Sequence, residues 1–162
     1  MKALRRHLRT VWKRVPISAR LWLLTLLYGL AGGAVAVAFL TATNGLYARL
    51  FPPLAARGLP LFAAGSLAVV VLSTLAVGFL LHRFRQDAAG SGIPQLKQAY
   101  WRDWGALTWR GAWVKLVAGV LSLAGGSSLG REGPTVYASG AAASALAGQL
   151  GIPKRHRRTA AA

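Results

Sequence analysis

Two long stretches without charge dominate the first half of the chain. One stretch of 28 residues lies between Arg20 and Arg49, and a second of 25 residues ends just before Arg83. A helix of about 20 apolar residues spans a bilayer core of about 30 Å. The pattern therefore predicts two membrane-spanning helices, at about residues 21–50 and 58–82. The first is longer than the core is thick, so we expect it to tilt or to extend into the headgroups.

The apolar pattern of the second half is interrupted. Over residues 90–134 a short apolar run is followed by the flexible sequence AGGSSLG, and a second apolar block covers residues 134–150. Backbone interruptions at membrane depth are tolerated only inside protein or beside a wet cavity. We therefore expect broken helices over 90–134 and a helix over 134–150. Small residues at four-residue spacing in this last helix predict close packing against other helices: Gly140, Ser144 and Gly148.

Basic residues collect at both ends of the chain. Residues 1–17 alternate apolar and basic positions in a way that predicts an amphipathic interfacial helix, although a frayed basic tail is the alternative. Seven Lys and Arg up to Arg20 place the amino terminus in the cytoplasm by the positive-inside rule. The remaining residues, 18–162, are predicted to form the membrane domain, with a basic cytoplasmic end at 151–162.

Composition supports a membrane protein. Charged residues make up 14% of the chain and hydrophobic residues 54%, whereas charged residues make up about a quarter of soluble domains. The net charge of +17 raises nucleic acid as a partner, but the basic residues flank apolar blocks instead of forming a face of a mixed sequence. There is no cysteine and the three histidines are scattered, so no metal site and no cofactor are expected.

Two short motifs combine glycine with proline: GSGIP at Gly90–Pro94 and GREGP at Gly130–Pro134. Proline suits the first turn of a helix, and glycine lets the backbone approach a ligand closely. Each motif therefore predicts a helix amino terminus whose free amide groups favour anions. Transporters commonly aim such discontinuous helices at a substrate within the membrane.

Glu132, the only glutamate, lies inside the second motif. A carboxylate at the bilayer centre costs about 3 kcal/mol, so an acid at membrane depth indicates a functional site. Beside a helix amino terminus this carboxylate would occupy the place of an anion. We therefore expect it to compete with a transported anion and to vacate the site when protonated. A simple Arg131–Glu132 ion pair at the membrane surface is the alternative.

Ser91 and Lys115 each have two interpretations. The Ser91 hydroxyl is either a helix cap or an anion ligand. Lys115 either extends to a membrane interface or lines the anion path.

With both motifs in this order and context, the chain resembles the CLC family of chloride channels and proton-coupled chloride exchangers, through GSGIP and GREGPTV. The resemblance implies an all-α multi-pass membrane protein with long tilted and broken helices, the first part of a CLC-type inverted-repeat core. It implies chloride transport, with protons as the second partner in exchangers, in a cell membrane. It also implies a homodimer with one pore per subunit.

The resemblance implies roles for particular residues. Ser91, with Gly92 and Ile93, would hold a central chloride, and Glu132 would be the gating glutamate. Lys115 matches a basic position of the family. The backbone around Gly130–Thr135, with Gly133 and Pro134, would line the outer anion position, and Arg131 would lie near the outer mouth. The chain departs from the family at Gln95 after Pro94, where many members carry an acid, and at Tyr137.

The resemblance also implies that the chain covers only the early part of the family's core. The later Gly-x-Phe-x-Pro loop and the tyrosine of the final helix do not occur in it. We therefore expect an amino-terminal fragment that does not transport alone. The alternative is a small basic membrane protein or anchor without transport activity.

Two enzyme motifs fail. GGSSLG before Arg131 resembles a phosphate loop, but arginine replaces the lysine and Glu132 replaces the hydroxyl that binds magnesium. The G-x-S-x-G at Gly126–Gly130 needs a strand–turn–helix and a later acid and histidine. We therefore expect no enzyme.

Overall fold

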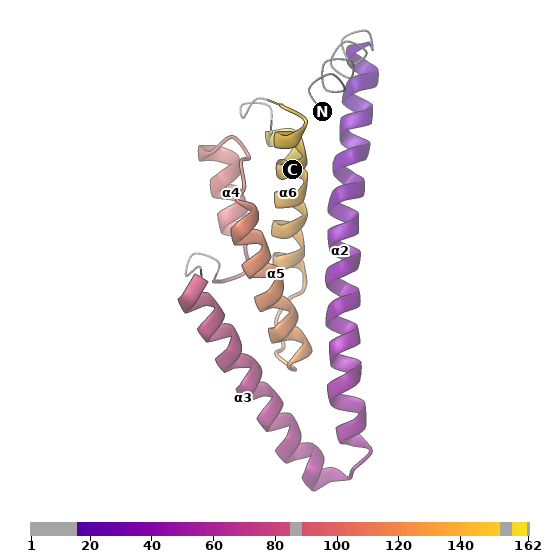
Figure 1. Ribbon diagram of the computed structural model, residues 1–162, viewed down its shortest axis with the longest axis vertical. Helices are drawn as coiled ribbons and strands as arrows, with labels where there is room; N and C mark the ends of the chain where they lie inside the picture. Colours follow the sequence, from indigo (N-terminus) through magenta and orange to yellow (C-terminus); the bar gives the residue numbers. More distant parts are fainter. Residues whose placement is uncertain (1–15, 85–88, 153–156, 162) are drawn as a thin grey trace, which may run out of the picture.

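The computed structural model describes residues 16–84, 89–152 and 157–161, and all the regular elements in them are helices. The amphipathic helix expected over residues 1–17 lies outside the described residues except for its last two. The all-helical fold predicted from the pattern is confirmed. Figure 1 labels the helices, whose bounds are α2 (Ile17–Ala55), α3 (Leu59–Phe84), α4 (Ile93–Arg102), α5 (Trp109–Ala124), α6 (Glu132–Gln149) and α7 (Arg158–Ala161).

Helices α2 and α3 are the two long apolar helices of the fold. Both are long and apolar enough to cross a membrane, and only 6% and 0% of their most apolar windows are buried. The 39 residues of α2 extend about 58 Å, roughly twice a bilayer core. Helix α2 continues past Arg49 to Ala55, five residues beyond the expected end. The difference arises because a charge limits a membrane span but does not end a helix.

Exposed hydroxyl groups on Thr41, Ser66 and Thr74 of these long helices bond to their own backbone. Thr41 Oγ1 donates to the Val37 carbonyl at 2.7 Å, and Thr74 Oγ1 donates to the Val70 carbonyl at 2.8 Å. Hydrocarbon offers no hydrogen-bond partner, so polar groups facing lipid must be satisfied within their own helix. These hydroxyls therefore meet the requirement for a lipid-exposed surface.

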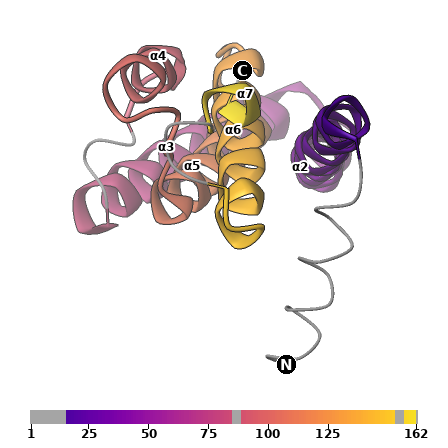
Figure 2. The same ribbon diagram turned by 90° about the horizontal axis from the view of Figure 1, so that it is seen from above.

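The interrupted region forms separate short helices, as the pattern predicts. Helix α6 contacts α2, α4, α5 and α7 and carries more buried residues than any other described helix. Figure 2 shows it between α2 on one side and α4 on the other. It begins at Glu132, two residues before the expected start at Pro134. A proline at the third helical position is tolerated because its missing N–H would have no acceptor inside the helix.

Small residues of α6 make its closest contacts. Ser139 Oγ donates to the Gly32 carbonyl of α2 at 3.0 Å. Ser144 is buried, donates to the Gly105 carbonyl at 2.8 Å and accepts from the Leu107 N–H at 3.3 Å. The stripe of small residues was expected to pack against other helices. At Ser144 the stripe instead contacts the turn after α4, because the Ser144 hydroxyl satisfies two backbone groups that the turn leaves unpaired.

The end of the chain folds back onto α4. The Arg158 guanidinium lies 4.4 Å from the Trp104 ring centroid and donates from Nη2 to the Trp101 carbonyl at 3.2 Å. Gly105 has φ of 75°, and a Cβ there would lie 2.9 Å from the Arg157 carbonyl oxygen. The described part of the expected basic end at 151–162 is therefore packed against the fold. Helix α7 lies at the same end of the molecule as the start of α2 (Figure 1).

Candidate anion site

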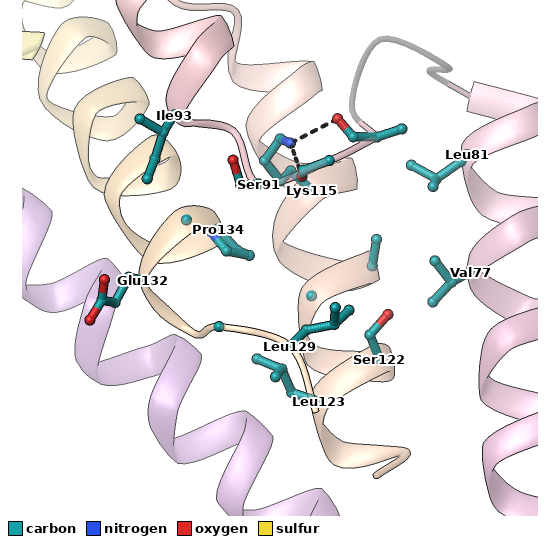
Figure 3. A pocket seen from close by; sticks show the side chains of 16 residues that line it. Val77, Leu81, Ser91, Ile93, Lys115, Ser122, Leu123, Leu129, Glu132 and Pro134 are labelled. Carbon is teal, nitrogen blue, oxygen red and sulfur yellow. Dashed lines mark hydrogen bonds between the residues drawn. The ribbon is translucent and has the colours of Figure 1, made fainter. Parts of the chain in front are cut away.

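A cavity of about 490 Å³ lies where the two glycine–proline motifs meet. Helix α3 contributes one wall with Val77 and Leu81, α5 contributes a second, and the starts of α4 and α6 complete it. Figure 3 shows these elements around the cavity. Residues of both motifs line it: Gly90, Ser91, Ile93, Glu132, Gly133 and Pro134.

Glycines bring the two motifs into direct contact. A Cβ on Gly133 would collide with the Ser91 carbonyl oxygen and would lie 2.9 Å from the Ser91 carbonyl carbon. Gly92 has φ of 92°, and a Cβ there would lie 2.9 Å from Tyr137 Cβ. A left-handed φ and such short contacts both favour glycine. The glycines were expected to admit a ligand, and here they admit the backbone of the other motif.

The start of α4 presents Ser91 to the cavity. The first hydrogen bond inside the helix runs from the Leu96 N–H to the Gly92 carbonyl at 2.9 Å, so the Ile93 N–H has no acceptor within α4. Gly92 precedes the helix without a side-chain cap. The Ser91 side chain is exposed, and its hydroxyl forms no hydrogen bond with the described residues. The Ser91 hydroxyl therefore does not cap α4 in the structure.

The start of α6 carries Glu132 as its first helical residue. The first bond inside the helix runs from the Thr135 N–H to the Arg131 carbonyl at 3.4 Å, so the Glu132 and Gly133 N–H groups precede any acceptor. An acid in the first turn is favoured by the helix dipole. The Glu132 side chain is exposed, and Figure 3 shows its carboxylate directed away from Ser91 and Lys115. The alternative that the sequence left open is an ion pair between Glu132 and Arg131. Within the described ranges no such ion pair is formed.

Lys115 reaches the first motif from α5. It is only 2% exposed, and its ammonium donates to the Gly90 carbonyl at 2.8 Å and lies 3.5 Å from the Ala89 carbonyl oxygen. The ammonium is also 5.3 Å from the Tyr137 ring centroid. The side chain is therefore buried against the first motif and does not extend to a membrane interface.

Sequence reasoning missed Gly119 of α5, which the cavity requires. A Cβ on this glycine would lie 3.1 Å from the Phe39 ring of α2 and 3.2 Å from Pro134 Cβ. Since Phe39 lies near the middle of α2, the start of α6 is held partway along the long helix, as Figure 1 also shows. A glycine inside an apolar helix is the signal that could have indicated this close approach.

The cavity brings together groups of the kinds that favour an anion. Helix amino termini carry roughly half a positive charge, and here two of them are joined by a hydroxyl and a nearby ammonium. In the described part of the chain no group of three His, Cys, Asp or Glu side chains could hold a metal ion.

Comparison with known proteins identifies the family. The family model described as "Voltage gated chloride channel" matches residues 73–162, more than half of the chain and all of the described cavity. The chain belongs to this family. It is therefore a membrane protein of the CLC family of channels and transporters, as its motifs indicate, and not an enzyme.

Curated relatives agree with this family. The chain is 46% identical over 85 residues to the H(+)/Cl(-) exchange transporter ClcA of Vibrio vulnificus, which covers 51% of the chain and 18% of that protein. It is 35% identical over 120 residues to the ClcA transporter of Klebsiella pneumoniae, covering 73% of the chain and 25% of that protein. The chain thus spans about a fifth to a quarter of these relatives. No solved structure matches it significantly.

Proposed function

We propose that the protein contributes the first part of a chloride pathway, as a CLC-type channel or a chloride/proton exchanger. One observation carries the proposal: Gly133 brings the start of α6 against Ser91, so that two helix amino termini share one cavity. Chloride would be held there by the Ser91 hydroxyl, by amides after Gly92 and by amides at the start of α6. Such oriented amides favour anions without a metal or a cofactor.

In this proposal Glu132 is the gate. Its position at the first residue of α6 allows a carboxylate to take the place of an anion on the same amides. When ionised the side chain competes with chloride, and when protonated it releases the amides. Exchange of protons for chloride would follow if this proton came from the opposite side of the membrane. The exchanger named among the relatives supports this possibility.

The proposed setting is a cell membrane with the amino terminus on the cytoplasmic side. The start of α2 and the docked α7 lie at one end of the molecule, where Arg20, Arg157 and Arg158 bring positive charge. Basic residues favour the cytoplasmic side. We also propose the homodimer that the family resemblance implies, with one pore in each subunit.

A second candidate is a membrane anchor without transport. The exposed apolar surfaces of α2 and α3 support it, since they account for membrane residence without any use of the cavity. In that case the protein would carry no chloride across a bilayer.

The test is chloride efflux from liposomes that contain the full-length product of the gene. The proposal expects efflux that increases as the pH falls, because protonation of Glu132 opens the site. Glu132→Gln, which mimics the protonated acid, should give efflux that no longer depends on pH. Asp103→Asn removes an exposed acid outside the cavity and serves as the control. Wild-type pH dependence in Glu132→Gln would contradict the gate, and no efflux from the unaltered protein would favour the anchor.

A further inference from the structure

The loop before α4 is held by two side chains from different helices. Lys115 of α5 donates from Nζ to the Gly90 carbonyl at 2.8 Å, with the Ala89 carbonyl oxygen 3.5 Å away. Gln95 of α4 donates from Nε2 to the Ala89 carbonyl at 2.9 Å. Figure 3 shows the Lys115 ammonium directed at these carbonyls. Two consecutive carbonyl groups are therefore drawn toward donors.

We propose that Lys115 and Gln95, here called the loop clamp, are positioning residues that hold these two carbonyls away from bound chloride. This inference rests on the proposed function of the cavity. Carbonyl oxygens carry partial negative charge, so a carbonyl that turned into the cavity would repel an anion. The clamp keeps the donor groups of the loop, and with them the Ser91 hydroxyl, on the cavity side.

The clamp fixes the loop on both sides of Ser91. The Lys115 ammonium holds Gly90, which precedes it. The Lys115 stem lies under Gly92, which follows it, since a Cβ on Gly92 would lie 3.0 Å from Lys115 Cδ. Because both neighbours of Ser91 touch one buried side chain, a change at residue 115 would move Ser91.

The burial of Lys115 makes this arrangement costly to change. A buried ammonium needs strong acceptors, and hydrogen bonds from a charged donor are about twice as strong as neutral ones. The two carbonyls supply such acceptors at a position where the side chain is 2% exposed. Lys115 therefore acts on chloride through the loop, by holding its carbonyls, and Gln95 reinforces it from α4.

The test measures chloride flux against chloride concentration for the full-length protein in liposomes. Lys115→Met keeps the stem but removes the donor, and we expect the half-saturating chloride concentration to rise about tenfold, the scale of a lost charged hydrogen bond. Lys115→Arg keeps a donor for both carbonyls, so its half-saturating chloride concentration should stay within about threefold of that of the unaltered protein. Gln95→Met should raise it less than Lys115→Met. Lys97→Met removes an equal charge from an exposed position of α4 and should leave the half-saturating chloride concentration unchanged.

A second measurement separates the clamp from the transport proposal. Amide hydrogen exchange in detergent should be faster over residues 89–93 in Lys115→Met and Gln95→Met, with α6 as slow as in the unaltered protein. If the unaltered protein carries no chloride, the transport proposal fails, and this exchange still decides the clamp. Unchanged exchange in Gln95→Met, or an equal loss of chloride affinity in Lys97→Met, would overturn the clamp. If Lys115→Met does not fold, amide exchange over residues 89–93 in Gln95→Met alone tests the clamp.

Discussion

Replacing Gly133 by alanine adds one methyl group at the contact between the two motifs. The new Cβ would collide with the Ser91 carbonyl oxygen and would lie 2.9 Å from the Ser91 carbonyl carbon and 3.0 Å from Ser91 Cβ. Gly133 is buried. The atoms that it would meet belong mainly to backbone, which cannot rotate aside as the end of a long side chain can. The start of α6 and the loop before α4 would therefore have to separate.

Overpacking of this kind costs about 1–3 kcal/mol. At about 2 °C per kcal/mol for a large protein, the midpoint of thermal unfolding should fall by about 2–6 °C. The same separation would withdraw Ser91 from the start of α6, so the half-saturating chloride concentration should rise with the loss of stability.

The assay is thermal unfolding of the full-length protein in detergent, followed by tryptophan fluorescence. Gly130→Ala is the matched control, because no atom lies within 4 Å of a Cβ at that glycine of the same motif. We expect the control to unfold within about 1 °C of the unaltered protein, as most neutral substitutions do. Equal midpoints for Gly133→Ala and Gly130→Ala would refute the contact between the motifs.

Three further changes test other parts of the structure. Ser91→Ala should weaken apparent chloride affinity in the liposome flux assay, whereas Ser128→Ala, an exposed hydroxyl outside the cavity lining, should leave it unchanged; equal affinities would remove Ser91 as a ligand. Ser144→Ala leaves two backbone groups of the turn after α4 without their partner, and should lower stability by about 1–3 kcal/mol in thermal unfolding; a smaller loss than about 0.5 kcal/mol would contradict this role. Arg158→Ala removes the contact with Trp104 and should cost about 0.5–2 kcal/mol, with Arg158→Lys intermediate; an unchanged midpoint would show that α7 is not held there.

The long helices and the broken region could be predicted because both depend on local pattern. An uncharged run longer than a bilayer core admits few structures other than a membrane helix. The two glycine–proline motifs mark helix starts through the conformations of those residues alone. The start of α6 was misplaced by two residues because a proline is compatible with any position in the first turn.

The contacts between segments far apart in the chain could not be predicted in the same way. Lys115 binds a carbonyl 25 residues earlier in the chain, and Arg158 binds one 57 residues earlier. Such partners depend on how the helices pack, and the apolar pattern carries no information on which turn a buried donor will face. The sequence left Lys115 between a membrane interface and the anion path. The side chain lines the cavity, but no pattern predicted the loop whose carbonyl it binds.

Glu132 illustrates the same limit at the proposed gate. Its position at the start of a helix follows from the motif, but the direction of its carboxylate depends on the rotamer. In the structure the carboxylate is directed away from Ser91. Under the proposed gate, a carboxylate in this direction would leave the amides at the start of α6 to chloride.

The most direct test of the anion site is the position of bromide, which replaces chloride and scatters X-rays anomalously. Crystals of the full-length protein grown in bromide should show an anomalous peak inside the cavity, between Ser91 and the start of α6. Glu132→Gln should strengthen a second peak at the amides of Glu132 and Gly133. Bromide bound only elsewhere on the protein, with no peak between the two motifs, would contradict the account.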